Sequence, residues 1–290
     1  MHIKKWVEFA TKRGYDSFAP PLALILDFLT LLFHRGLSYS SINTARSALS
    51  TYISVDGQPM GVHPLVRRFM KGVFQLRPAL PKHNVIWDTT VVLDYIKKLS
   101  PVKVLTLKRL TFKLVMLIAL LTGQRCQTMH ALTVANTTVT DSCVKFRVNS
   151  LLKQSRLNYH LHELKIKAYA PDRRRCIVTV IREYLKRTEN IRTSDNLLIS
   201  YVKPFKAVSR DTISRWVKTV LGLSGVDTTI FTAHSTRAAA TTSAKGLHVP
   251  LNTIMRTAGW SNSNTFAKYY DKTEVPTKDF AEEIQNKAMR

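Results

Sequence analysis

Apolar residues recur at helical spacing along the first quarter of the chain. The third of these segments is typical, because its apolar stripe runs through Ile42, Ala45 and Leu49. Either Ser38 or Ser40 can cap its start. The pattern predicts a compact helical domain at this end of the chain. Its helices are expected over roughly residues 2–13, 19–34, 40–54 and 62–75.

The helical pattern is interrupted by the segment RPALPKHNVIWD. This stretch contains two prolines and no helical period, which is typical of an extended linker. We therefore expect a helical domain over residues 1–76, a linker over 77–88 and a second domain over 89–290.

Helices also dominate the pattern of the second domain, with one strand-forming region among them. Residues 107–123 form an apolar segment that ends at a glycine, as a buried helix would. Residues 143–149 and 160–169 alternate between apolar and polar positions, which predicts a small antiparallel sheet. The expected fold is mainly α with this one sheet (α+β). Further helices are predicted in WDTTVVLDYIKKL and over roughly 173–187, 209–222, 234–245, 250–257, 262–270 and 277–288.

The charge of the chain points to a polyanionic partner. Its 44 Lys and Arg outnumber 19 Asp and Glu, which gives a net charge of +25 although 45% of the residues are hydrophobic. The basic residues are spread along the whole chain, and such a broad positive surface favours a nucleic acid as the ligand. In the first domain Arg46, Arg67, Arg68 and Lys71 are candidates for contacts with such a ligand, although they could equally form a solvated face.

The remaining composition suggests neither a metal site nor a membrane anchor. The three cysteines are widely spaced and form no CxxC pair, which is typical of a reducing compartment. The longest apolar run, residues 22–33, contains Asp27 and is about half as long as a membrane span. No signal-peptide pattern opens the chain. We therefore expect a soluble, intracellular protein.

The segment HSTRAAATTSAKG places a histidine and an arginine on one helical face. His234 and Arg237 are three residues apart, so both can point at one object. Arginine does not ligate metals, whereas its planar guanidinium matches phosphate oxygens, and a helix N-terminus adds positive potential. The plain alternative is a core histidine beside a surface arginine.

Other candidate residues are weak signals when each is taken alone. Arg125 follows a helix-ending glycine, and Lys153 lies at the predicted turn between the two strands. Trp260 precedes a short predicted helix that carries Tyr269 and Tyr270. A surface arginine, a solvated lysine and packed aromatic side chains are the ordinary explanations of these positions.

Taken together, Arg125, Lys153, the His-x-x-Arg pair, Trp260 and a tyrosine resemble the tyrosine recombinases of the phage integrase family. The resemblance covers most of the chain: residues 1–76 resemble the family's core-binding domain, and residues 89–290, after the linker, resemble its catalytic domain. In this family the two domains close around double-stranded DNA. It is closest to the recombinases of DIRS-type and Crypton-like mobile elements, in which phrases similar to GLSYSSIN, TGQR, LLK.SR and GW....TF...Y recur.

The resemblance implies a DNA recombinase or integrase that uses no metal, ATP or other cofactor. A tyrosine attacks a phosphodiester and forms a 3′-phosphotyrosyl intermediate. Arg125 and Arg237 would hold the non-bridging oxygens, and Lys153 would protonate the leaving 5′-oxygen. His234 would assist deprotonation of the tyrosine or hold the phosphate, and Trp260 would pack against the site.

Two positions depart from the common pattern of the family. Many members carry Glu three residues after the first arginine, where this chain has Thr128. The nucleophile is also ambiguous, because bacterial and phage spacing from Trp260 indicates Tyr269, whereas the pattern of eukaryotic elements indicates Tyr270. Adjacent helical residues point about 100° apart, so only one of them can face the phosphate. We favour Tyr270.

The resemblance further implies a homo-tetramer on paired DNA sites, no membrane partner and a mobile-element origin. The last predicted helix, residues 277–288, would pack on its own domain or on a neighbouring protomer. A eukaryotic protein of this kind would act in the nucleus, and a bacterial one in the cytoplasm or nucleoid. The alternative function is a catalytically silent DNA-binding protein with the same fold. A type IB topoisomerase shares the chemistry, but the chain is short and the resemblance extends well outside the site.

Overall fold

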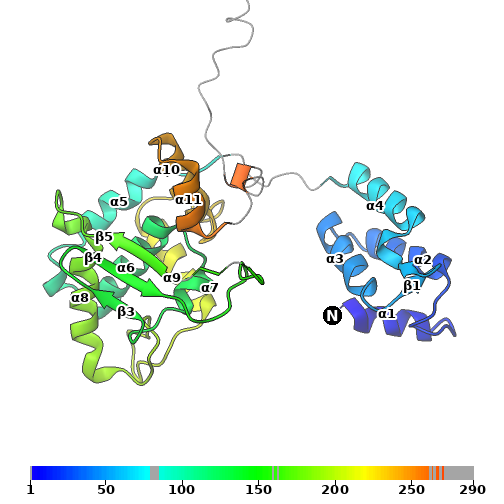
Figure 1. Cartoon of the computed structure of the whole chain (residues 1–290), viewed down its shortest axis with the longest axis horizontal. Helices are drawn as coiled ribbons and strands as arrows, with labels where there is room; N and C mark the ends of the chain where they lie inside the picture. The colour runs from blue at the N-terminus through cyan, green and yellow to red at the C-terminus, as the bar shows by residue number, and fades with distance from the viewer. Residues whose placement is uncertain are drawn as a thin grey trace, which may run out of the picture. The chain divides into compact units, whose positions relative to one another are not determined.

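The computed structural model divides the chain into two compact units, Met1–Lys82 and His83–Arg290 (Figure 1). Tyr269 and the predicted helix over 277–288 lie outside the residues that the structure describes, as does most of the predicted helix over 262–270. The described residues are 2–78, 85–158, 160–161, 163–260, 263, 266, 267 and 270.

The first unit contains the four helices that the apolar pattern predicts. Their buried faces meet in one core, in which the ring of Trp6 lies 5.3 Å from that of Phe28. The third helix begins at its Ser38 cap, whose Oγ accepts a hydrogen bond from the Ser41 amide. The elements are α1 (His2–Thr11), α2 (Leu22–His34), α3 (Tyr39–Leu49), β1 (Ser54–Val55), β2 (Gln58–Pro59), η1 (Met60–Val62) and α4 (Pro64–Leu76).

The helix predicted over 40–54 ends earlier, because a short hairpin follows α3. Strands β1 and β2 pair antiparallel, and Asp56 and Gly57 turn the chain between them with φ of 51° and 73°. Both values lie in the left-handed region, which helices do not use. Strands of two residues are too short to leave a periodic signal in the sequence.

The second unit is mostly helical with one small sheet, so the predicted fold class is confirmed. Strands β3, β4 and β5 form an antiparallel sheet in that order. Helix α6 is the central helix, with α8, α9 and α10 against it (Figure 1). The elements are α5 (Thr89–Lys98), η2 (Val102–Val104), α6 (Leu107–Thr122), α7 (Cys126–His130), β3 (Thr137–Val139), β4 (Cys143–Arg147), β5 (Glu163–Lys167), η3 (Arg173–Arg175), α8 (Ile177–Thr188), η4 (Glu189–Ile191), α9 (Arg210–Leu223), α10 (Ser235–Gly246) and α11 (Leu251–Ala258).

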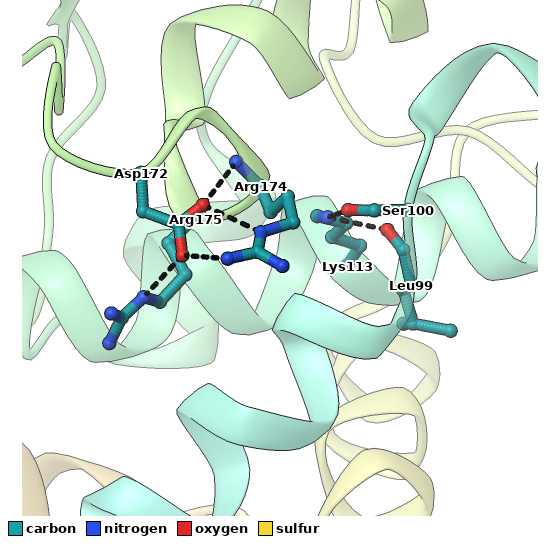
Figure 2. A network of polar contacts seen from close by, with 6 residues as sticks. All are labelled: Leu99, Ser100, Lys113, Asp172, Arg174 and Arg175. Atoms are coloured by element: carbon teal, nitrogen blue, oxygen red, sulfur yellow. Dashed lines mark hydrogen bonds and ion pairs between the residues drawn. The ribbon is translucent and has the colours of Figure 1, made fainter.

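A buried lysine fastens the end of α5 to α6. Lys113 is 0% exposed, and its Nζ donates hydrogen bonds to the Leu99 carbonyl at 2.5 Å and to the Ser100 hydroxyl at 3.1 Å (Figure 2). Burial lowers the pKa of Lys113 to about 8, and the charge of Asp172 opposes this shift. The bond to Leu99 satisfies a carbonyl at the end of α5, where no further helical turn can do so.

The residues before α5 pack on α10. Trp87, near the end of the range expected to be a linker, is 6% exposed and belongs to the core of the second unit. Its Nε1 donates to Ser235 Oγ at 2.9 Å, and Thr89 Oγ1 donates to Ser243 Oγ at 3.2 Å. These contacts fix the first and the third turn of α10, the helix that begins at the predicted His-x-x-Arg pair.

Candidate active site

Three predicted site residues line one cavity of the second unit. Arg125 reaches it from the start of α7, while His234 and Arg237 reach it from the start of α10. The cavity has a volume of about 350 Å³, and Arg210 and Ser214 of α9 also line it. Segments far apart in the sequence therefore direct two arginines and a histidine into one space.

The end of α6 explains how these elements come so close. Helix α6 stops at Gly123, which has a left-handed φ of 58°. A Cβ atom at this position would lie 3.1 Å from Thr241 Cγ2 and 3.6 Å from Ala258 Cβ. Glycine thus provides both the turn and the space that lets α10 and α11 pack against the end of α6. Arg125 follows this turn as the N-cap residue of α7.

Arg237 is a buried cation in this site. It is 2% exposed, and its Nη1 donates to the Gly123 carbonyl at 2.5 Å. Its Cζ lies 3.9 Å from the centre of the Trp260 ring. Stacking and a hydrogen bond together fix the plane of a guanidinium, so the fork of Arg237 has one orientation.

Tyr270 lies against the same residues. Its hydroxyl is 3.1 Å from His234 Nε2, and its ring centre is 4.6 Å from that of Trp260. The backbone is also fixed, because Thr242 Oγ1 of α10 donates to the Tyr270 carbonyl at 2.7 Å. Tyr270, His234, Arg237 and Trp260 therefore form one contiguous cluster.

The surroundings of His234 favour its neutral form. The residue is exposed overall, but its ring is partly shielded from water where it meets Tyr270. This desolvation lowers the pKa of His234, and the positive charges of Arg237, Arg125 and Lys153 lower it further. A neutral imidazole whose Nε2 carries no proton can accept the hydrogen of the Tyr270 hydroxyl.

We expect His234 to titrate below the ordinary histidine pKa of about 6.5. The imidazolium forms only below that pH, so at pH 7 the ring is neutral. The check is an NMR titration of the His234 Cε1 proton in the full chain. Lys153→Met removes one of the charges and should raise the midpoint, whereas Lys167→Met, at an exposed position of β5, should leave it unchanged. A wild-type midpoint at or above about 6.5 would contradict the prediction.

Two glutamines hold the predicted Lys153 loop and Arg125 in place. The exposed Lys153 donates its backbone N–H to Gln127 Oε1 of α7 at 3.2 Å. In the opposite direction, Arg125 Nη1 donates to Gln154 Oε1 at 2.7 Å. Sequence reasoning did not select either glutamine. The one sequence signal for them was the threonine at position 128. A chain that lacks the common glutamate there needs another acceptor for Arg125.

The other predicted DNA contacts lie in the first unit. Arg46 and Arg67 line a cavity of about 400 Å³ together with Ser47 and Thr51. Arg46 Nη1 donates to the Gly61 carbonyl at 3.2 Å, which holds its side chain across this cavity. Arg68 and Lys71 are exposed on α4 but are not among the residues that line it.

Within the described residues, no three His, Cys, Asp or Glu side chains are grouped as a metal ion would require. No helix in the same part of the chain has the length and apolar character needed to cross a membrane.

Solved structures share the architecture of this chain. XerH site-specific recombinase bound to palindromic difH substrate, a post-cleavage complex, aligns with a TM-score of 0.60 at 16% identity over 93% of this chain and 73% of that one. The Tn1549 transposon integrase in complex with transposon right end DNA aligns with a TM-score of 0.59 at 14% identity, over 93% of this chain and 85% of that one. A lambda integrase dimer bound to a COC′ core site aligns with a TM-score of 0.53 at 16% identity, over 94% of this chain and 88% of that one. At these identities the likeness concerns the fold.

The family follows from the sequence match. Comparison with curated proteins gives no significant match. The model of the phage integrase family, in contrast, matches residues 97–275, which is more than half of the chain. This range contains Arg125, the His234–Arg237 pair and Tyr270. The chain therefore belongs to the phage integrase family and is a tyrosine-type site-specific DNA recombinase.

Proposed function

We propose that this chain cuts and rejoins double-stranded DNA through a 3′-phosphotyrosyl intermediate, with Tyr270 as the nucleophile. The observation that carries the proposal is the 3.1 Å contact between the Tyr270 hydroxyl and His234 Nε2. Beside it, Arg237 and Arg125 line the same cavity. A nucleophile, a proton acceptor and two cations are the groups that attack on a phosphodiester requires.

The proposed reaction proceeds by one exchange at phosphorus. The Tyr270 oxygen forms a bond to phosphorus while its proton passes to His234 Nε2, and the bond from phosphorus to the 5′-oxygen breaks. Lys153 gives a proton to that oxygen, which leaves as a hydroxyl. Arg125 and Arg237 stabilise the charge on the non-bridging oxygens. The reverse exchange with a hydroxyl of another strand releases the tyrosine and completes strand transfer.

This reaction consumes no high-energy bond, because one phosphodiester replaces another. The proposal therefore includes independence from ATP. It also includes independence from metal ions, because Arg125 and Arg237 supply the positive charge that stabilises the phosphate. It is tested with a nicked duplex whose sequence the protein has selected from a random library. The expected result is a covalent protein–DNA adduct that forms in EDTA and without ATP. DNA binding without any adduct would instead favour a catalytically silent DNA-binding protein.

The cavity of the first unit supports a further part of the proposal, a contact with a DNA backbone phosphate. Arg46 and Arg67 supply guanidinium groups there, and Ser47 and Thr51 supply hydroxyls. Such donors are typical of phosphate contacts, which position a protein on DNA without reading its sequence. We include Arg68 and Lys71 as outer contacts, because they are exposed on α4, the helix that also carries Arg67.

Neutralising Arg67 should weaken DNA binding equally for all sequences. We expect Arg67→Gln to make the negative slope of log binding constant against log salt shallower by about one unit. One fewer phosphate contact releases fewer counterions. Fluorescence anisotropy with a selected and an unrelated duplex measures this effect. Arg35→Gln removes the same charge from an exposed position at the end of α2. Equal changes in both variants would show a general charge effect and no contact at the cavity.

The finer assignment is also proposed. The phrases GLSYSSIN, TGQR, LLK.SR and GW....TF...Y favour a recombinase of a DIRS-type or Crypton-like mobile element, which acts as a tetramer on two DNA sites and, in a eukaryote, in the nucleus. Light scattering of the chain with a duplex that carries its selected site tests the assembly. Four protomers with two duplexes are expected, whereas one or two protomers on a single duplex at saturation would contradict the tetramer.

A further inference from the structure

The side chain of Gln154 is held between Arg125 and the end of α11. Its Oε1 accepts the 2.7 Å hydrogen bond from Arg125 Nη1. On the other side it meets Gly259, where a Cβ atom would lie 2.7 Å from Gln154 Nε2. Gly259 also has a left-handed φ of 71°, so its lack of a side chain serves both the turn and the packing. The amide of Gln154 thus occupies a shaped space beside the guanidinium.

The direction of this hydrogen bond fixes how the amide lies. The guanidinium offers only donors, so the carbonyl oxygen of Gln154 must face Arg125 and its NH₂ group must face away. Gln154 Nε2 is buried and makes no hydrogen bond with the residues that the structure describes. A carboxylate in its place would bury a second charged oxygen there, which is costly without a donor.

A neutral acceptor also leaves the charge of Arg125 available. An amide orients the guanidinium through one hydrogen bond, whereas a carboxylate would also neutralise part of its field. Thr128 on α7 is 1% exposed, and its Oγ1 makes no hydrogen bond with the described residues. The acceptor for Arg125 is therefore supplied by the loop after β4 and not by its own helix.

Gln127 provides the return connection between the same two segments. It lies on α7, two residues after Arg125, and its Oε1 accepts the Lys153 backbone N–H at 3.2 Å. Each segment thus carries one cation and one glutamine that holds the other segment. Two hydrogen bonds that run in opposite directions restrain the distance between the turn before α7 and the Lys153 loop.

We propose that Gln154 and Gln127 are positioning residues for strand cleavage, with Gln154 orienting the guanidinium of Arg125 and Gln127 anchoring the loop that carries Lys153. This inference rests on the proposed function, because it assigns Arg125 to phosphate stabilisation and Lys153 to protonation of the leaving oxygen. The two glutamines act on different steps of the same reaction. Their loss therefore has different chemical signatures.

A sulfur leaving group separates the two roles. In a duplex with a bridging 5′-phosphorothiolate at the cleavage position, the leaving group is a thiolate. Thiols have a pKa of about 8.5, so this group departs without a proton. Lys153→Ala should be severely slow on the ordinary duplex and restored on the sulfur duplex. Gln127→Leu should lose about 10- to 100-fold on the ordinary duplex and recover in the same way.

Gln154→Leu should behave differently, because it acts through Arg125. We expect a loss of about 10- to 100-fold on both duplexes, since phosphate stabilisation is needed with either leaving group. Gln154→Glu restores an acceptor for Arg125, but it also buries a charged oxygen and offsets part of the guanidinium's field, so it should recover only part of the rate. Gln154→Leu at the wild-type rate, or Gln127→Leu equally slow on both duplexes, would overturn the inference.

Two measurements without DNA keep this test separate from the proposed function. Arg125→Met and Gln154→Leu should each lower the melting temperature, and the losses should be less than additive in the double variant. The reason is that both substitutions remove the same hydrogen bond between Arg125 and Gln154. The Lys153 amide should exchange hydrogen faster in Gln127→Leu, with the Val144 amide of β4 unchanged. Additive losses together with unchanged Lys153 exchange would refute the positioning roles. Failure of wild type to form an adduct, or of sulfur to rescue Lys153→Ala, would instead refute the proposed function, whatever these two measurements show.

Discussion

Tyr270→Phe is expected to abolish the covalent adduct with nicked DNA, whereas Tyr269→Phe should retain it. The Tyr270 hydroxyl lies 3.1 Å from His234 Nε2. Removal of a nucleophile costs on the order of 10⁶-fold in a serine protease, and we expect a comparable loss here. The adduct is measured by gel mobility after denaturation, with a duplex that the protein has selected.

Phenylalanine is a suitable substitution because it removes only the hydroxyl. The ring of Tyr270 packs 4.6 Å from that of Trp260, and this contact is available to phenylalanine as well. The melting temperature of Tyr270→Phe and its affinity for DNA should therefore stay close to those of wild type. Loss of the adduct in Tyr269→Phe, with retention in Tyr270→Phe, would assign the nucleophile to the neighbouring residue.

The choice between these tyrosines shows what a linear pattern cannot resolve. Spacing from Trp260 indicates Tyr269 in one part of the family and Tyr270 in another, and the two residues are adjacent. The structure describes Tyr270, and its hydroxyl lies at hydrogen-bonding distance from a histidine 36 residues earlier in the chain. That contact depends on how the chain returns to the start of α10, which no local period encodes.

Much of the fold could be predicted because its helices are long and have one apolar face. Helix α6 is the clearest case, since the run predicted over 107–123 forms a helix that stops at Gly123. The strands β1 and β2 were not predicted, because two residues are too few to show the alternation of a strand. Helix α7 matters for function, since it carries Gln127 and begins at Arg125.

The supporting contacts of the site were beyond sequence reasoning for a related reason. A motif identifies Arg125 and Lys153 by their neighbours in the chain, whereas Gln154 is defined by what it touches. Its partners are Arg125, on another segment, and the end of α11 near Gly259. The absence of a glutamate at position 128 indicates that Arg125 needs an acceptor, but it does not say which segment supplies it.

The site as a whole is organised to keep positive charge near a neutral histidine. Arg237, Arg125 and Lys153 all lower the pKa of His234, so the charges that would attract a phosphate also keep the imidazole able to accept a proton. One arrangement thus serves two requirements. A variant that removes a cation from this group should change both phosphate stabilisation and the titration of His234.

Arg237→Lys is expected to reduce the rate of DNA cleavage by about 10²- to 10³-fold, the usual cost of losing one preorganised donor at a transition state. Lysine keeps the charge, but it cannot reproduce the planar fork that donates to the Gly123 carbonyl while it stacks 3.9 Å from the centre of the Trp260 ring. Single-turnover formation of the adduct measures the rate, and anisotropy measures DNA affinity.

The effect of Arg237→Lys should fall mainly on the rate, because the geometry of the fork matters most when charge develops on the phosphate oxygens. Affinity reflects the sum of many phosphate contacts over the whole duplex, and the total charge is unchanged in this variant. Arg256→Lys, an exposed position on α11, is the matched control and should leave both quantities unchanged. A lysine variant of Arg237 that cleaves at the wild-type rate would mean that only the charge at this position matters, and that its fixed plane has no part in catalysis.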